Sequence, residues 1–172
     1  IRSIFCGEHR HKRISTAIGA RAFHKTTTPI KQSNMKVLVT GGLGFIGSHT
    51  VVELQNEGFE VVIIDNLSNS SEDVLKGIVA ITGKTPIFEK MDLREKAAVQ
   101  NFFKKHHDVA GVIHFAASKA VGESVENPLL YYENNINTLV YILQELQQKE
   151  QANFIFSSSC TVYGEADKMP TT

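Results

Sequence analysis

Residues 35–47 read MKVLVTGGLGFIG, a short apolar run followed directly by three evenly spaced glycines, Gly41, Gly44 and Gly47. The apolar run predicts a buried parallel strand, and a helix must then begin within a few residues of its end. We expect Gly41 to permit the tight turn, Gly44 to let an anion approach bare backbone, and Gly47 to let the helix pack closely on the strand. The first N–H groups of such a helix point at the anion, which is typical of a dinucleotide-phosphate site. A ligand-free strand, turn and helix is the alternative reading of the glycines alone.

The next segment argues for a ligand. Apolar residues at helical spacing predict a helix over 48–58 that ends at Gly58, and a second strand follows over 60–64. Asp65 ends that strand, 18 residues after Gly47. A carboxylate there accepts hydrogen bonds from the ribose hydroxyls of a dinucleotide and repels a 2′-phosphate, so the sequence favours NAD over NADP.

Strand-like and helix-like segments alternate along the rest of the chain. We expect helices over 72–82, 94–107 and 129–149, and strands over 86–89, 111–115 and 153–157. Right-handed crossovers then give an α/β fold, a doubly wound parallel sheet of the Rossmann type with strand order 3-2-1-4-5, truncated after the fifth strand. A ligand would lie above the carboxyl ends of strands 1 and 4, where the strand order reverses.

The charge is unevenly distributed although the net charge is zero. Residues 1–34 carry seven Lys and Arg against the single acid Glu8, and they show neither strand nor helix periodicity, so we expect a disordered basic extension. It reads as translated sequence upstream of a start at Met35, as an organelle transit peptide, or as a nucleic-acid arm. Because the chain begins at Ile1 rather than Met, the first reading is favoured. Residues 35–172 then form an incomplete NAD-binding domain without a substrate domain.

Composition excludes several classes of protein. With 42% apolar residues the chain can bury the core of one compact domain, and no run of about 18 apolar residues predicts a membrane span. Cys6 and Cys160 lack C-x-x-C spacing, which suits a reducing, cytoplasmic compartment and argues against zinc. The run 106–108, His-His-Asp, reads as solvated surface, so no metal and no nucleic-acid partner are expected.

Two loops after predicted strands hold further candidates. Lys119, after the fourth strand, can reach ribose or phosphate oxygens, or it is a solvated loop lysine. The serines of 157–159, after the fifth strand, can orient a substrate alcohol, or they cap backbone groups of a turn.

Five motifs carry a family resemblance: TGGLGFIGSH, VIIDNLSNS, MDL, HFAASKAVGESVENPLLYYENN and FIFSSSCTVYG, in that order. From Met35 to Thr172 they resemble the N-terminal half of the UDP-glucose 4-epimerases, nucleotide-sugar enzymes of the extended short-chain dehydrogenase/reductase family. The resemblance implies bound NAD, a UDP-hexose substrate, and a homodimer built partly by the helix predicted over 129–149. It also implies hydride removal from C4 of the sugar and its return to the other face of the 4-keto intermediate.

The resemblance assigns roles to individual residues. Around the pyrophosphate and adenosine it places Gly41, Gly44, Phe45, Ile46, Asp65, Asn66, Ser68, Asn69, Ser70, Asp92 and Leu93. Beside the nicotinamide ribose it places Phe115, Ala116, Ala117, Lys119 and Asn134, and at the mouth of the fifth strand Ser157. Ser159 matches the serine that bonds the sugar 4-hydroxyl.

The family's base, the tyrosine of a Tyr-x-x-x-Lys pair, has no match here. Four residues after the tyrosines stand Asn135, Ile136, Glu145 and Asp167. We therefore expect an inactive fragment, in which the base falls beyond Thr172. Two alternatives remain: a fragment of a nucleotide-sugar dehydratase, disfavoured by Cys160-Thr161 where an Asp-Glu pair is needed, and a non-enzymatic NAD-sensing module.

Overall fold

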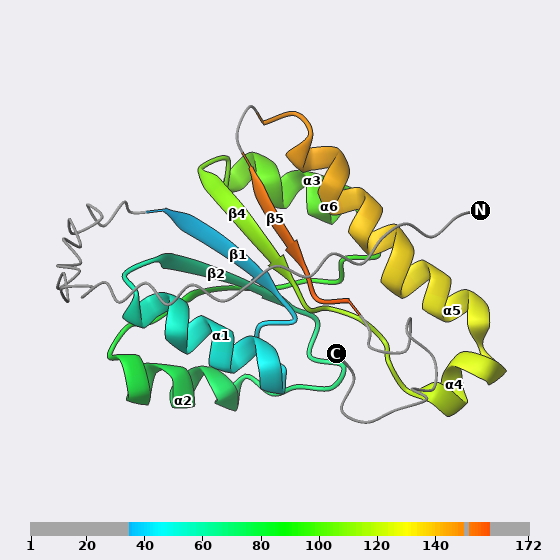
Figure 1. Ribbon diagram of the computed structural model, residues 1–172, viewed down its shortest axis with the longest axis horizontal. Helices are drawn as coiled ribbons and strands as arrows, with labels where there is room; N and C mark the ends of the chain where they lie inside the picture. Colours follow the sequence, from blue (N-terminus) through cyan, green and yellow to red (C-terminus); the bar gives the residue numbers. More distant parts are fainter. Residues whose placement is uncertain (1–34, 150–151, 159–172) are drawn as a thin grey trace, which may run out of the picture. The chain divides into compact units, whose positions relative to one another are not determined.

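The fold is a five-stranded, wholly parallel sheet, described for residues 35–149 and 152–158 of a computed structural model. Its strands are β1 (Lys36–Thr40), β2 (Glu60–Asp65), β3 (Ile87–Lys90), β4 (Val109–His114) and β5 (Asn153–Phe156). They lie in the order β3-β2-β1-β4-β5, which confirms the predicted doubly wound α/β topology (Figure 1). The order reverses between β1 and β4, so the sequence placed the switch point correctly.

Helices cover the sheet on both faces. The helices α1 (Phe45–Asn56) and α2 (Asp73–Thr82) lie on one face, and α3 (Lys96–Lys105) and α6 (Thr138–Leu146) lie on the other (Figure 1). Connections from β1 toward β3 run in one direction across the sheet and those toward β5 run in the opposite direction. Right-handed crossovers therefore place the two pairs of helices on opposite faces.

Alternate residues of each strand feed two separate cores. Val37 and Val39 of β1 pack with α1 and α2, whereas Leu38 between them packs with α3 and α6. Both sets are at most 8% exposed. Because a parallel sheet is buried on both faces, its strands read as continuous apolar runs, and this made them recognisable in the sequence.

Two features of the helices differ from the sequence-based expectation. The loop after β4 contains a short helix, α4 (Val121–Glu126). The helix expected over 129–149 is divided into α5 (Pro128–Tyr132), a π-helical turn η1 (Glu133–Asn137) and α6. A π-helical turn accommodates one extra residue, and such turns arise where side chains must be redirected.

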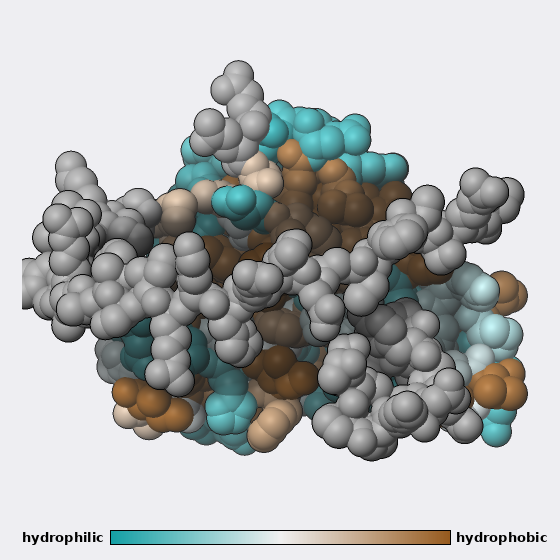
Figure 2. All heavy atoms as spheres, viewed as in Figure 1, coloured by the Kyte–Doolittle hydropathy of each residue, from teal (hydrophilic) through white to brown (hydrophobic). Residues whose placement is uncertain are grey.

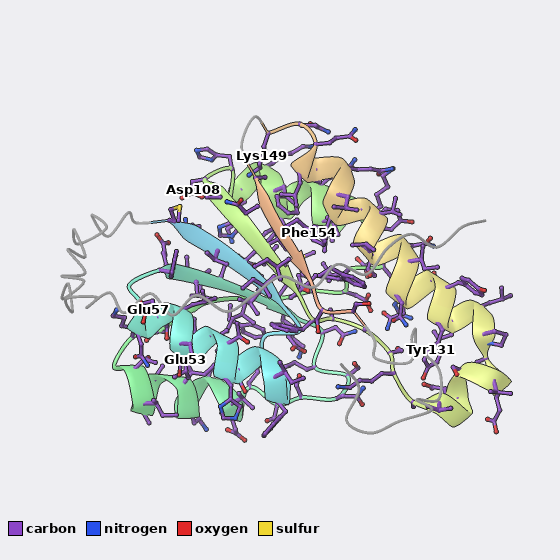
Figure 3. All side chains as sticks on the ribbon, viewed as in Figure 1. Glu53, Glu57, Asp108, Tyr131, Lys149 and Phe154 are labelled. Carbon is purple, nitrogen blue, oxygen red and sulfur yellow. The ribbon has the colours of Figure 1, made fainter. Side chains whose placement is uncertain are left out.

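Ion pairs and a buried lysine stem fix the amino edge of the sheet. Lys36 Nζ lies 2.6 Å from Asp108 and 3.2 Å from Glu60, and its ammonium holds the pKa of the Asp108 carboxyl below its usual value. Lys149 Nζ donates to the carbonyls of His107 and Val109, each at 3.0 Å, and burial lowers its pKa (Figure 3). This edge is opposite to the one at which the predicted site residues lie.

None of the helices within the described residues is long and apolar enough to span a membrane.

Candidate nucleotide-binding site

The predicted site residues converge at the carboxyl edge of the sheet. Backbone hydrogen bonds join the ends of neighbouring strands there: Gly41 N–H to Ile64 O at 2.8 Å, Phe115 N–H to Thr40 O at 3.1 Å, and Ser157 N–H to His114 O at 3.2 Å. The segments that follow β1, β2, β4 and β5 are therefore adjacent, although more than 110 residues separate the first from the last.

The glycine turn follows β1 and depends on the absence of side chains. Gly41 has φ +65°, and a Cβ on it would lie 2.9 Å from Ala116 N. A Cβ on Gly47 would lie 2.2 Å from Gly41 O, so no larger residue fits without moving the turn. We expected Gly47 to let the helix pack closely on the strand. Gly47 lies in the first turn of α1, and a Cβ there would also come within 2.8 Å of Gly42 Cα, so this turn packs directly against the backbone that leaves β1.

The second glycine, Gly42, was missed by the sequence analysis. Its Cβ would lie 2.7 Å from Cγ2 of Ile63 on β2, so the turn packs directly onto the neighbouring strand. The sequence does contain a signal for this packing: Gly42 directly follows Gly41, although the three-glycine pattern requires no glycine at position 42. Gly44 is less confined, because a Cβ there would meet only Gly41 O, at 3.3 Å.

The amino end of α1 is open to a ligand. Gly44 is its N-cap, and no side chain caps the first turn. Phe45 and Ile46 are 83% and 53% exposed, although both are large and apolar. Uncapped N–H groups and the positive end of the helix dipole favour an anion, and the exposed apolar side chains flank that position.

Asp65 is more engaged with the protein than the sequence analysis assumed. It is 8% exposed, and its Oδ2 accepts the Leu43 N–H of the glycine turn at 3.0 Å. Its Oδ1 accepts the Leu67 N–H at 2.9 Å and the Ser70 hydroxyl at 2.7 Å. A carboxylate offers about four lone-pair positions, so about one remains for a ligand hydroxyl. Asp65 therefore ties the glycine turn to the loop after β2.

The segments after β2 and β3 meet through polar side chains. Asn66 Nδ2 lies 3.4 Å from Asp92 Oδ2, and Arg94 holds the same carboxylate at 2.7 Å. The Arg94 guanidinium lowers the pKa of Asp92. Leu93, expected beside an adenine, has its side chain in the core at 6% exposure, so only its backbone faces this edge. Of the remaining expected residues of this segment, Ser68 and Asn69 are exposed.

The segment after β4 combines packed and exposed residues. Phe115 and Ala116 pack against opposite cores, whereas Ala117 and Lys119 are exposed. Asn134 Nδ2 donates to the hydroxyl of Ser118 at 2.5 Å. Asn135 was missed by the sequence analysis, although its amide bonds both backbone groups of Ser118.

A buried histidine lies under the site. His114 is 1% exposed and its Nδ1 lies 2.7 Å from the hydroxyl of Thr40, which also accepts the Ala116 N–H at 3.3 Å. Phe156 stacks on the ring. Burial lowers the pKa of His114 to about 4, so the imidazole is neutral near pH 7. The neutral His114 ring is thus packed and hydrogen-bonded beneath the site.

Ser157 is exposed at the end of β5, and Ser159 lies outside the described residues. Over residues 35–149 and 152–158, His, Cys, Asp and Glu form no group of three that could hold a metal ion.

An apolar hollow of about 220 Å³ lies away from this edge. It is lined by residues near the amino ends of β1, β4 and β5 together with Leu54 and Phe59, and Asn153 is its one polar lining side chain. Apolar surface around β5 is visible in Figure 2. A hollow of this composition lacks the donors that a phosphate requires, so the candidate site remains at the carboxyl edge.

Curated relatives resemble the chain over most of its length. It is 49% identical over 138 residues to the UDP-glucose 4-epimerase of Haemophilus influenzae and 47% identical over 138 residues to that of Bacillus subtilis. Each match covers 80% of this chain and 40% of the relative. The chain thus spans about two fifths of the length of these relatives.

Solved structures show the same likeness. The UDP-glucose 4-epimerase of Bifidobacterium longum, in complex with NAD+ and UDP, superposes with a TM-score of 0.75 at 43% identity, over 80% of this chain and 41% of that one. That of Stenotrophomonas maltophila, with bound NAD and formylated UDP-arabinopyranose, gives 0.73 at 44% identity, over 80% and 40%. The model of the NAD dependent epimerase/dehydratase family matches residues 37–172. The chain therefore belongs to the NAD dependent epimerase/dehydratase family.

Proposed function

We propose that this chain is the NAD-binding part of a UDP-glucose 4-epimerase, a cytoplasmic enzyme of galactose and nucleotide-sugar metabolism. The observation that carries the proposal is the uncapped amino end of α1 beside Asp65, at the switch point of the sheet. Relatives 47–49% identical are UDP-glucose 4-epimerases, and two structural neighbours hold NAD or NAD+. These likenesses support the choice of cofactor and reaction.

The residues present fit a dinucleotide. A Cβ at Gly41 or Gly47 would close the turn, and the first N–H groups of α1 have no side-chain cap, so the pyrophosphate has donors and room. Asp65 retains about one lone pair for a ribose hydroxyl, and its charge repels a 2′-phosphate. The exposed Lys119 supplies a cation for the second half of the cofactor.

In the proposed reaction, NAD held by the glycine turn, Asp65 and Lys119 would supply reversible hydride chemistry at C4 of the sugar. The chain's own residues would hold the phosphates at the amino end of α1 and orient the ribose at Asp65. Removal of the 4-hydroxyl proton requires a positioned base, and no tyrosine in the 172 residues is followed four residues later by lysine. We therefore expect the isolated 172-residue chain to bind cofactor and to show no turnover of UDP-galactose in a coupled assay.

Isothermal titration of the 172-residue protein with NAD and NADP tests the cofactor site. We expect NAD to bind at least about tenfold more tightly than NADP, because Asp65 opposes the 2′-phosphate. Phe45→Ala should weaken NAD binding and leave the melting temperature unchanged, since Phe45 is 83% exposed. Ile81→Ala is the matched control, because Ile81 is also exposed but lies on α2. Equal affinity for NAD and NADP would contradict the proposed role of Asp65 in this site.

We propose that residues 35–172 suffice for this site and that residues 1–34 are not required for cofactor binding. A chain beginning at Met35 should bind NAD as the full chain does. Weaker binding by the shorter chain would show that the basic extension contributes to the site.

We further propose that the parent enzyme is a homodimer. Five apolar residues are 40–79% exposed at spacings of three or four along α5, η1 and α6: Leu129, Tyr132, Ile136, Val140 and Leu143. The opposite side of α6 packs in the core through Ile142 and Leu146. Such a stripe suits pairing with the same helix of a second copy. Light scattering of the parent enzyme should show a dimer. Ile136→Glu should dissociate this dimer, whereas Ile81→Glu should not. A monomeric wild-type enzyme would contradict the proposal.

A further inference from the structure

We propose that Tyr131 and Asn135 are positioning residues that hold the backbone on both sides of Lys119, and thereby aim its ammonium group at the nicotinamide-ribose half of NAD. The inference rests on the proposed function, because it assumes that Lys119 faces the cofactor. It adds two residues that make no contact with the cofactor themselves and act only through the loop after β4.

Asn135 holds the residue before Lys119 by both of its backbone groups. Its Oδ1 accepts the Ser118 N–H at 2.7 Å, and its Nδ2 donates to the Ser118 carbonyl at 2.9 Å. One side-chain amide thus imitates the pairing of a strand neighbour at an isolated loop residue. Asn134 adds a bond to the Ser118 hydroxyl at 2.5 Å. All three groups of Ser118 that form hydrogen bonds are therefore engaged by one turn of helix.

Tyr131 holds the residue after Lys119. Its hydroxyl lies 2.7 Å from the Ala120 carbonyl and 2.7 Å from Glu123 Oε2, at the start of α4 (Figure 3). Tyr131 and Asn135 are four residues apart and share one side of their helix. That side consequently contacts the residue before Lys119, the residue after it, and the helix that continues from it.

The π-helical turn η1 explains how two consecutive asparagines reach the same serine. In a regular α-helix, neighbouring side chains diverge by about 100°. Asn134 and Asn135 lie within η1, where the wider turn reduces this divergence, and both reach Ser118. A π-helical turn weakens a helix unless it serves another contact, and such turns are frequent at functional sites. The bonds to Ser118 are the contact that the turn serves here.

The backbone around Lys119 is thus fixed, whereas its side chain is exposed. A cation on a fixed stem loses less freedom when it binds a ribose or phosphate oxygen than one on a free loop. Removing the Asn135 or Tyr131 contact should therefore weaken binding of the nicotinamide-ribose half of the cofactor, which Lys119 reaches. Binding of the half held by the glycine turn should not change.

Titration with NAD and with ADP separates these two halves, because ADP carries the adenosine and phosphates without the nicotinamide ribose. We expect Asn135→Ala and Tyr131→Phe to weaken NAD binding by about 5- to 30-fold, the effect of losing one or two hydrogen bonds, and to change ADP binding by less than about twofold. Asn137→Ala and Tyr132→Phe are the matched controls, since both residues are exposed neighbours on the same helical stretch. Neither control should change the affinity for NAD.

A double-mutant cycle with Lys119→Met shows whether the effect passes through Lys119. In the Lys119→Met background, Asn135→Ala should cause no further loss of NAD affinity. An additive loss, or an equal loss for NAD and ADP, would overturn the inference and assign Asn135 to general stability. If the wild type binds NAD and the variants bind it equally well, the inference alone fails. If the wild type binds neither nucleotide, the proposed function fails with it.

Discussion

Replacing Asp65 by alanine should destabilise the folded domain as well as the cofactor complex. The carboxylate accepts three protein hydrogen bonds, of which the one from Leu43 is buried and those from Leu67 and Ser70 are partly buried. A hydrogen bond to a charged group contributes about 1.5–3 kcal/mol when buried and less when exposed. Counting the buried bond in full and the other two at about half, we expect the free energy of unfolding to fall by about 3–6 kcal/mol.

Thermal unfolding followed by circular dichroism measures this loss without any ligand. In a domain of this size, 1 kcal/mol corresponds to about 3–5 °C, so Asp65→Ala should melt about 10–30 °C below the wild type. Asp73→Ala is the matched control: its carboxylate pairs with Lys76 at the surface, where side chains 76% and 82% exposed contribute less than about 1 kcal/mol. Equal melting of the two variants would refute the view that Asp65 ties the glycine turn to the loop after β2.

Two further predictions concern the stability of the folded domain. Gly47→Ala should lower the free energy of unfolding in urea titrations by about 1–3 kcal/mol, because its Cβ would lie 2.2 Å from Gly41 O. Gly77→Ala is the control: Gly77 lies on α2 with open space around it, so this substitution should raise the free energy of unfolding by about 0.5–1 kcal/mol. Burial lowers the pKa of His114 to about 4, whereas the unfolded chain keeps the ordinary value of about 6.5. Between these two values the unfolded chain binds a proton that the folded chain does not. His114 should therefore lower the free energy of unfolding by about 3 kcal/mol from pH 7 to pH 4 and leave it unchanged above pH 7.5. His114→Gln should flatten that slope, and an unchanged slope would exclude His114 as its source.

The sheet was predictable because each strand carries its own signal. Continuous apolar runs such as 60–64 are buried on both faces, and helical segments separate them, so parallel pairing and right-handed crossovers leave one simple strand order. The boundaries were less accurate. The helix after the glycine turn begins at Phe45, three residues before the predicted start, because the apolar periodicity becomes visible only from Val51 onward.

The division of the long helix was not predictable from local pattern. The apolar residues of α5 and α6 continue at helical spacing through η1, so periodicity alone indicates one uninterrupted helix. Asn134 and Asn135 of this turn bond Ser118, 16–17 residues away along the chain, although their side chains suit a helix surface equally well. Only a three-dimensional structure reveals this partner.

The sequence placed Asp65 correctly at the end of β2 but did not reveal the hydrogen bonds that its carboxylate makes within the protein. Its position at the end of β2 indicated a ribose acceptor, and position is all that a sequence pattern reports. The same carboxylate bonds Leu43, two residues after the turn glycine that itself approaches Ala116. Hydrogen bonds therefore join the loop after β2 to the glycine turn, and a close backbone approach brings that turn to the segment that carries Lys119. The two halves of a bound dinucleotide would rest on this one connected frame, so a change at Asp65 should affect the Lys119 side as well. The effect of Asn135→Ala, by contrast, should remain on its own side, because both of its hydrogen bonds are to Ser118 and neither reaches the glycine turn.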